Sequence, residues 1–419
     1  MSKLGWAAAA ALLTMACNGG GEDTETEVPT YHADVRPVLD QYCVRCHQEG
    51  GLGVGDWTNQ EHVELFGDLI ADRMQSGDMP PPVSDPACRD YVGSDYLSVP
   101  QSASDTISAW VAGGMPVGDP ADDPQVPVEE VDLVDADLTI MMEEPYTPVF
   151  DDAANPGNEY RCFLVDPGED EIHISGMDPI IGADELVHHV VLFGLDRDEV
   201  EEGMNSPGGW DCIDDMDADA MIAGWAPGTM PLEFPDGYTM TTGGDQVLVL
   251  QMHYFQADPE SAGTSDLSGY AFHTAPEPGR PVIMAPLGSY NWTIPAGDDD
   301  FKHSTTYPHS LLGVNIDIQV HAIFPHMHRL GTHYSMKIEH EDGTSTCLVE
   351  GDYDFDNQLT YQFRERPLFS PGDRITFECG WNNSDSNPNL VGDPIDTRYG
   401  ERTDEEMCFF FTLVSPGAP

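Results

Sequence analysis

The sequence predicts a multidomain protein in which a small all-α domain precedes two tandem antiparallel β-sandwiches of jelly-roll-like type. Three observations support this prediction. In the first hundred positions apolar residues recur at three- and four-residue steps, and a proline- and acid-rich stretch then follows. From residue 132 onward, short alternating apolar runs are separated by Gly, Pro, Asn and Asp. At roughly 100 to 200 residues per domain, the 419 residues accommodate these units.

The chain begins with a segment typical of export signals. Lys3 precedes an apolar, alanine-rich run from Trp6 to Met15, and Cys17 follows almost at once. The segment resembles a bacterial lipoprotein signal, in which the cysteine is lipidated, although Thr14 stands where that family usually has Leu. We therefore expect residues 1–17 to be a signal and Cys17 a lipid attachment site in the cell envelope, in the periplasm or at the outer membrane. Ordinary cleavage and release is the alternative.

The charge balance excludes two classes of partner. Lys and Arg total 16 against 75 Asp and Glu, which gives a formal net charge of −59. Such a chain repels phosphate backbones and anionic headgroups, so we expect no nucleic-acid binding and no electrostatic membrane docking. No apolar run reaches the roughly 20 residues that span a bilayer. Membrane contact is expected only through the lipid anchor.

The helical domain is predicted to span residues 30–116, after a flexible acidic tether over residues 18–29. Between His62 and Met74 the apolar residues lie on one helix face, and Pro80 to Pro82 are expected to end that helix. The residues on this face are Val63, Leu65, Phe66, Leu69, Ile70 and Met74.

A second helix is predicted to close this domain. Ser104 or Asp105 supplies its N-cap, Ile107 and Trp110 lie on its apolar face, and Gly113 ends it. Residues 117–131 then form a linker, because their prolines and acids show no periodicity.

The remaining chain is predicted to be all-β. Nearly 290 residues exceed one sandwich, so we expect two, over residues 132–285 and 286–419, with the chain passing between them near residues 281–295. The clearest predicted strands are residues 246–255, 311–321, 374–381 and 407–414.

The helical domain contains the motif C-x-x-C-H as Cys43, Cys46 and His47. Two thiols at this spacing can add to the two vinyl groups of one haem, while the next residue lies beneath the iron as an axial ligand. Zinc would need two further ligands at similar spacing, and none follows. The motif therefore predicts a covalent haem c, against the alternatives of a disulfide or a core histidine.

Around this motif, residues 30–116 resemble small c-type cytochrome domains. The similarity rests on DVRPVL before the motif, on GDMPPP, and on a closing helix with Trp110 before GGMP. It implies that Met79 is the distal thioether ligand, which raises the iron potential and suits electron transfer. Met74 and Met115 are the alternatives.

The β-rich region carries histidines in four separate elements. ELVHHVVLFG contains His188 and His189, VLVLQMHYF contains His253, FPHMHRLG contains His326 and His328, and DEEMCFFF contains Met407. Residues i and i+2 of a strand share a face, so His326 and His328 can bind one metal. Adjacent His188 and His189 can do so only where the backbone bulges.

This set resembles the type II copper, ascorbate-dependent monooxygenases, the family of peptidylglycine hydroxylating monooxygenase and dopamine β-monooxygenase. The similarity covers roughly residues 140–415 through HHVVLFG, GWAPGTMP, LQMHY, HMHRLG and DEEMC. It implies two copper ions in two sandwiches. The implied ligands of the first copper are His188, His189 and His253, and those of the second are His326, His328 and Met407.

The ligand types support copper independently. Imidazoles without thiolate suit copper or zinc, and one thioether biases the second site toward Cu(I). Gln251 shares a strand face with His253, so it is either a partner of a copper ligand or a core amide.

The remaining cysteines fit an exported protein. The family resemblance implies that Cys162 pairs with Cys212 and Cys379 with Cys408. Cys88 and Cys347 have no implied partner, so they are either free or form a bridge between the cytochrome domain and the sandwiches.

The residues beside the second copper depart from the peptidylglycine enzymes. The positions at which those enzymes grip a carboxylate are occupied here by Phe324, Phe409 and Phe411. Period 2 places Met407, Phe409 and Phe411 on one face, so they form either an apolar substrate wall or ordinary core. An apolar wall predicts a substrate with an apolar C–H region.

Together these features predict an exported copper monooxygenase that hydroxylates a small molecule with O₂. Catalysis is expected at His326, His328 and Met407, with the other copper storing an electron. The fused haem suggests that electrons arrive through it from an ascorbate-like donor or a redox protein. The alternative is a non-catalytic copper-binding or electron-transfer surface lipoprotein.

Overall fold

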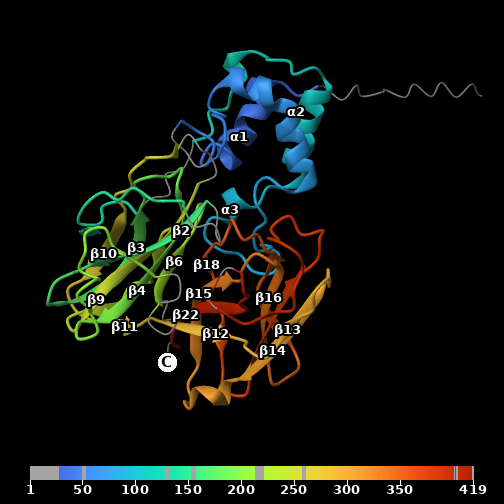
Figure 1. Cartoon of the computed structure of the whole chain (residues 1–419). Helices are drawn as coiled ribbons and strands as arrows, with labels where there is room; N and C mark the ends of the chain where they lie inside the picture. Colours follow the sequence, from blue (N-terminus) through green and yellow to red (C-terminus); the bar gives the residue numbers. More distant parts are fainter. Residues whose placement is uncertain are drawn as a thin grey trace, which may run out of the picture.

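The computed structural model describes residues 28–49, 53–127, 133–151, 157–212, 221–256, 261–400, 402 and 404–417. Cys17 and the predicted signal lie outside the described residues. A helical region packs above two β-rich bodies that lie side by side (Figure 1). Among the residues described, none of the helices has the length and apolar character needed to cross a bilayer.

The N-terminal region consists of helices, most of which surround a small apolar core. The helices are η1 (Tyr31–Val35), α1 (Arg36–Tyr42), α2 (Gln60–Ser76), α3 (Ser94–Leu97), α4 (Gln101–Ala112) and η2 (Pro120–Asp122). Trp110 of α4 is fully buried, and its indole N–H donates to the carbonyl of Pro116 at 3.1 Å. The core residues around it include Val35, Leu39, Trp57, Val63, Ile70 and Ile107.

One end of each long helix differs from the prediction, whereas Gly113 ends α4 as predicted. Helix α2 ends at Ser76, where Gly77 adopts φ +78°, so glycine and not the later prolines ends it. Leu65 lies outside the buried face and is 74% exposed. Helix α4 begins at Gln101, before the predicted cap, because Pro100 supplies the extended residue that precedes it.

The segment after α2, residues 83–97, leaves the helical core and packs on the second sandwich (Figure 1). Tyr91 is 1% exposed within the core of that sandwich and forms a β-bridge with Phe363. Cys88 forms a disulfide with Cys347, 259 residues away. Part of the chain assigned by sequence to the helical domain therefore fastens that domain to the C-terminal sandwich.

The first sandwich has two sheets. Its strands are β1 (Leu138–Met141), β2 (Asn158–Val165), β3 (Glu171–Ile180), β4 (Val187–Asp196), β5 (Trp210–Asp211), β6 (Met221–Trp225), β7 (Leu232–Glu233), β8 (Tyr238–Gly243), β9 (Gln246–Phe255), β10 (Gly269–Ala275) and β11 (Arg280–Pro281). One sheet has the order β1-β10-β3-β8-β11 with β7 on β3, and the other has the order β5-β2-β9-β4-β6. The Cys162–Cys212 disulfide has the pairing that the resemblance implied.

The second sandwich has the same two-sheet plan. Its strands are β12 (Ile283–Gly288), β13 (Thr293–Ile294), β14 (Phe301–Pro308), β15 (Ile318–His326), β16 (Gly331–Glu339), β17 (Ser345–Asp352), β18 (Tyr361–Gln362), β19 (Leu368–Phe369), β20 (Arg374–Trp381), β21 (Thr397–Arg398) and β22 (Phe409–Pro416). The orders are β12-β22-β15-β18, with β19 on β15, and β14-β20-β16-β17, while β13 pairs with β21. The second implied disulfide, Cys379–Cys408, is also present.

The predicted strands agree unevenly with these elements. Strands β9 and β20 have the predicted bounds, and β22 is shifted by two residues. The prediction over residues 311–321 is wrong in part, because residues 309–312 form a 3₁₀ turn that Gly313 ends and the strand begins at Ile318.

The two sandwiches share an apolar interface. Strand β11 pairs with β8 of the first, whereas β12 pairs with β22 of the second, so the chain crosses between them at Val282. A buried cluster joins residues from both sides, namely Val191, Phe193, Met221 and Val249 with Phe324, Met407, Phe409 and Phe411. This packing brings the sheet of β4 and β9 against the sheet of β15 and β22.

Candidate functional site

Three imidazoles of the first sandwich converge through the same ring atom. The Nδ1 of His188 lies 3.2 Å from that of His189 and 3.0 Å from that of His253, and the latter two are 3.3 Å apart. The register between β4 and β9 shifts between Val187 and His189. This bulge lets the adjacent His188 and His189 face the same point, as the sequence required.

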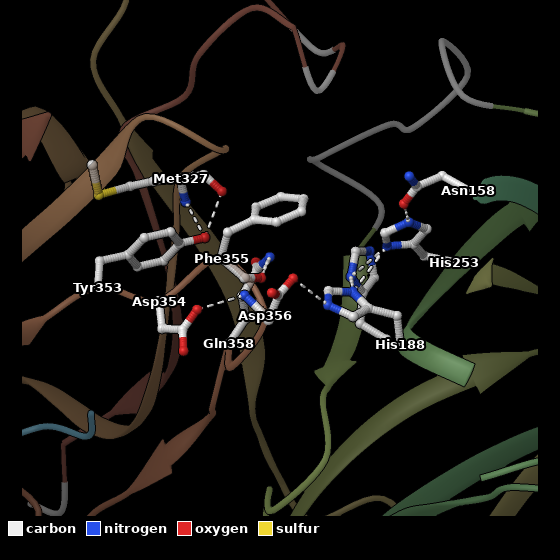
Figure 2. Close-up of polar contacts among 10 residues, drawn as sticks. Asn158, His188, His253, Met327, Tyr353, Asp354, Phe355, Asp356 and Gln358 are labelled. Carbon is white, nitrogen blue, oxygen red and sulfur yellow. Dashed lines mark hydrogen bonds and ion pairs between the residues drawn. The ribbon is translucent and has the colours of Figure 1, made fainter. Parts of the chain in front are cut away.

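The outer ring nitrogens of His188 and His253 are held by other residues (Figure 2). The Nε2 of His253 donates to Oδ1 of Asn158 at 2.7 Å, and the Nε2 of His188 donates to Oδ1 of Asp356 at 3.1 Å. Because each ring proton is on Nε2, both Nδ1 atoms present bare lone pairs to each other. Two lone pairs 3.0 Å apart with no proton between them fit a cation at their centre.

Burial keeps His189 and His253 neutral. Desolvation lowers the pKa of His189 and of His253 well below 6.5, and neighbouring histidines lower both further. His326 and His328 are among the groups that lower the pKa of His189. The two histidine sets therefore lie close enough to interact electrostatically. Tyr160 also stacks on His253, with ring centroids 4.1 Å apart.

The second set presents the opposite ring atom. The Nδ1 of His326 donates to Oε1 of Gln358 at 2.7 Å, and the Nδ1 of His328 donates to the carbonyl of Glu405 at 3.2 Å. The Nε2 atom of each ring is therefore unprotonated, and its lone pair is available to a metal ion. The two ring centroids are 5.2 Å apart. Burial lowers the pKa of His326 to about 4 and that of His328 to about 3.

The buried carboxylate of Glu406 joins the two parts of this second set. It accepts the backbone N–H groups of His328 at 3.0 Å, of Leu330 at 2.6 Å and of Met407 at 3.2 Å. The indole N–H of Trp381 also donates to it, at 3.0 Å. Burial raises the pKa of Glu406 to about 7. Glu406 was not predicted from the sequence, although an acid directly before an apolar strand was a visible signal.

Met407 and the three phenylalanines lie at the interface of the sandwiches. The rings of Phe324 and Phe411 are 6.0 and 6.1 Å from that of His326, and Phe409 lies 5.7 Å from Phe411. All three phenylalanines are buried in the interdomain cluster, together with Met407. They are thus packed core and also the apolar surroundings of His326.

Gln251, the other residue predicted near the first histidine set, lies on strand β9. The side-chain amide of Gln251 donates to the carbonyl of Cys212 at 3.3 Å, so its observed bond is to the disulfide region and not to the histidines. Asn158, Asp356 and Gln358, which do contact the histidines, were missed because they lie far from them in the sequence.

A cavity of about 510 Å³ lies between the helical region and the first histidine set. Cys43, Cys46 and His47 line it, together with Met74 and Met79. On its opposite side it is lined by residues of the sandwiches, including Leu186, His188 and Asp356. Met115 instead packs against Gly67 of α2.

The three residues of the C-x-x-C-H motif line this cavity. Cys43 and Cys46 are free thiols in a protein whose other described cysteines are paired, and burial raises the pKa of Cys43 to about 12. The Nδ1 of His47 donates to the carbonyl of Val54 at 2.9 Å, which leaves Nε2 as the free lone pair. The ring of Trp57 stacks on His47 with centroids 5.0 Å apart.

Comparison with known proteins gives matches over the two sandwiches. Residues 153–261 match the N-terminal domain, and residues 282–415 the C-terminal domain, of the copper type II ascorbate-dependent monooxygenases. The mouse DBH-like monooxygenase protein 2 is 27% identical over 263 residues, which are 58% of this chain and 40% of that protein. The MOXD1 homolog 1 of Drosophila melanogaster is 22% identical, over 58% of this chain and 38% of its own.

The matches cover only part of each protein. The chain spans about two fifths of the length of the curated relatives it matches. Among solved structures, the major capsid protein P2 of bacteriophage PM2 aligns with 62% of this chain and 98% of its own at 6% identity, but its TM-score of 0.24 is too low to relate the folds. The two family models together cover more than half of the chain. The chain therefore belongs to the copper type II ascorbate-dependent monooxygenases.

Proposed function

We propose that this protein is an exported copper monooxygenase that hydroxylates an apolar C–H bond with O₂ and receives its electrons through a fused haem c. The observation that carries the proposal is the pair of imidazole sets on facing sandwiches, one converging through Nδ1 and the other exposing Nε2. In the overall reaction, one oxygen atom enters the C–H bond, and two electrons and two protons reduce the other to water.

The donor atoms fit copper at both places. His188, His189 and His253 would hold the first ion, and His326, His328 and Met407 the second. Copper would supply one-electron redox chemistry, and the thioether favours its lower oxidation state at the second site. Zinc gains little from a thioether ligand.

The chain's own groups orient these ligands. Asn158, Asp356, Gln358 and the Glu405 carbonyl each accept one ring N–H, which fixes the tautomer and aims the other nitrogen inward. The aromatic rings of Phe324, Phe409 and Phe411 exclude water beside His326. With no charged group among these three, the wall favours a substrate that presents an apolar C–H region.

The haem would occupy the cavity that contains the C-x-x-C-H motif. Cys43 and Cys46 would form the two thioether bonds, His47 would ligate through Nε2, and Met79 would be the distal ligand, with Met74 as the alternative in the same cavity. Because His188 lines the cavity as well, an electron donor bound there is adjacent to the first copper ligand. An ascorbate-like molecule or a redox protein would reduce the haem.

The proposed location is the cell envelope, with the chain attached through lipid at Cys17. Its support is the N-terminal sequence together with three disulfides, which persist in oxidising compartments. Mass analysis of the membrane-extracted protein tests it, since cleavage before Cys17 and a diacylglycerol adduct are expected.

The first experiment is elemental analysis of the full chain, purified after export with copper and haem maturation supplied. We expect two copper ions and one iron per chain. Replacing His326 and His328 together by Ala should remove one copper and leave the iron, and replacing Cys43 and Cys46 by Ser should remove the iron only.

Oxygen uptake separates the enzyme from a non-catalytic copper protein. With a reductant and a panel of apolar C–H compounds, the enzyme consumes O₂ in proportion to hydroxylated product. Two bound coppers without product-linked uptake would instead support the copper-binding or electron-transfer lipoprotein.

A further inference from the structure

A single six-residue segment, Tyr353–Gln358, contacts histidines of both sets. Figure 2 shows its Asp356 facing His188. Its Asp356 accepts from His188 at 3.1 Å, and its Gln358 accepts from His326 at 2.7 Å. His188 belongs to the first sandwich, whereas the segment and His326 belong to the second. We call Tyr353–Gln358 the linking segment.

The linking segment has further contacts with each set. The hydroxyl of Tyr353 accepts the backbone N–H of Met327 at 3.0 Å and donates to the carbonyl of the same residue, which lies between His326 and His328. On the other side, the ring of Phe355 lies 5.7 Å from that of His188 and 6.5 Å from that of His253. The segment therefore contacts the first set through Asp356 and Phe355, and the second set through Gln358, with Tyr353 bonded to the backbone between His326 and His328.

Internal hydrogen bonds make the linking segment stiff. The backbone N–H of Asp356 donates to Oδ1 of Asp354 at 3.0 Å, and that of Asn357 donates to the carbonyl of Asp354 at 3.1 Å. The amide N–H of Gln358 donates to the carbonyl of Phe355 at 2.9 Å. This last bond fixes the orientation of the Gln358 amide, so that its oxygen must face the ring N–H of His326.

We infer that the linking segment couples the two copper sites, with Asp356 and Gln358 as positioning residues. Copper at the second site would order His326, and thereby Gln358, the turn and Asp356, so that His188 is already oriented when the first copper binds. By thermodynamic reciprocity, copper at the first site tightens the second by the same factor. This inference rests on the proposed function, since it requires that both histidine sets bind copper.

The test measures copper affinity and not turnover. Metal-free full-length protein is titrated with copper against a competing chelator, and the Cu(II) electron paramagnetic resonance signal shows which site fills. In the unmodified chain we expect cooperative uptake of two ions. Removing the second site with His326→Ala and His328→Ala should weaken the first site about tenfold, within the ordinary range of coupling between sites.

The decisive variant is Gln358→Leu, which retains every copper ligand. It should weaken the first site about tenfold in the presence of second-site copper, although Gln358 contacts only a second-site ligand. Asp356→Leu should produce the converse effect on the second site. The matched control is Asp352→Asn, an exposed acid beside the segment, and it should leave the coupling unchanged.

The outcomes separate this inference from the proposed function. If two ions bind independently in the unmodified chain, the coupling is refuted while the copper sites stand, and this result does not depend on how any variant folds. A Gln358→Leu variant that alters only the second site refutes it in the same way. If neither set binds copper, both proposals fail together.

Discussion

The carboxylate of Glu406 accepts the backbone N–H of His328 at 3.0 Å, across 78 positions of the chain. The same carboxylate accepts the N–H of Met407, so one side chain fixes the backbone of two proposed ligands of the second copper. The side chain of Glu406 is fully buried, so water cannot readily replace it as the acceptor of these bonds.

Replacing Glu406 should therefore damage both stability and the second site. Glu406→Ala leaves three backbone N–H groups and the indole of Trp381 without their acceptor, and we expect a loss of about 3–5 kcal/mol of unfolding free energy. Copper content should fall from two to one. Denaturant unfolding and elemental analysis measure these effects. Glu405→Gln is the control, because only the backbone carbonyl of Glu405 contacts His328.

Asn158 should determine the affinity of the first site. Asn158→Leu removes the acceptor of the His253 ring N–H, and we expect a 10- to 100-fold loss of first-site copper affinity. Asn158→Asp retains an acceptor oxygen, so its first-site copper affinity should exceed that of the leucine variant by about 10- to 100-fold. Chelator competition measures both. Equal affinities for the two variants would show that the bond has no role in ligation.

His321 should make the interface of the sandwiches acid-sensitive. It is 1% exposed, and its ring centroid lies 5.3 Å from that of Tyr238. Its Nε2 forms a hydrogen bond with the hydroxyl of Ser415 at 2.8 Å, while its Nδ1 has no partner among the described residues. Burial, reinforced by Arg366, lowers its pKa to about 4. The unfolded chain therefore binds the extra proton first as pH falls from about 6.5 to 4, and stability falls across that window.

The contribution of His321 is measurable by difference. At roughly 1.4 kcal/mol per pKa unit, it should amount to about 2–3 kcal/mol between pH 7 and pH 4. Unfolding curves of the unmodified chain and of His321→Gln, recorded over this range, should converge as the pH falls. Parallel curves would mean that His321 is not held neutral.

Met79 should set the potential of the proposed haem. A thioether ligand raises the iron potential, so Met79→Ala should lower the midpoint measured by optical redox titration, whereas Met74→Ala should leave it unchanged. Both residues line the same cavity, so each serves as the control of the other. A fall in potential with Met74→Ala alone would assign the distal ligand to Met74.

The Cys88–Cys347 disulfide should fasten the helical region to the second sandwich. Replacing both cysteines by Ser should cost about 2–5 kcal/mol, because the bond closes a long stretch of chain. Limited proteolysis should then cut residues 83–97 sooner than in the unmodified protein. Unchanged thermal unfolding and unchanged proteolysis would show that Tyr91 and its neighbours suffice for the attachment.

The kinds of residue available for chemistry, and their order along the chain, follow from the sequence alone. His188, His189, His253 and the later His-x-His could be assigned through family resemblance, because ligand types and short spacings are local properties. Alternation of apolar residues likewise predicted strands β9 and β20 within their observed bounds. Helix ends were less accurate, since Gly77 and Pro100 act through backbone geometry that the apolar pattern does not contain.

The residues that orient those ligands, and the segment that joins the two sites, depend on how the folded domains pack. Asp356 meets His188 across 168 positions, and Gln358 meets His326 from a turn that no periodicity marks. The bulge at His188 and the packing of residues 83–97 on the second sandwich are also set by long-range contacts. Local pattern reports which face of an element is apolar, but it cannot report which distant polar group will satisfy a ring nitrogen once two domains have packed.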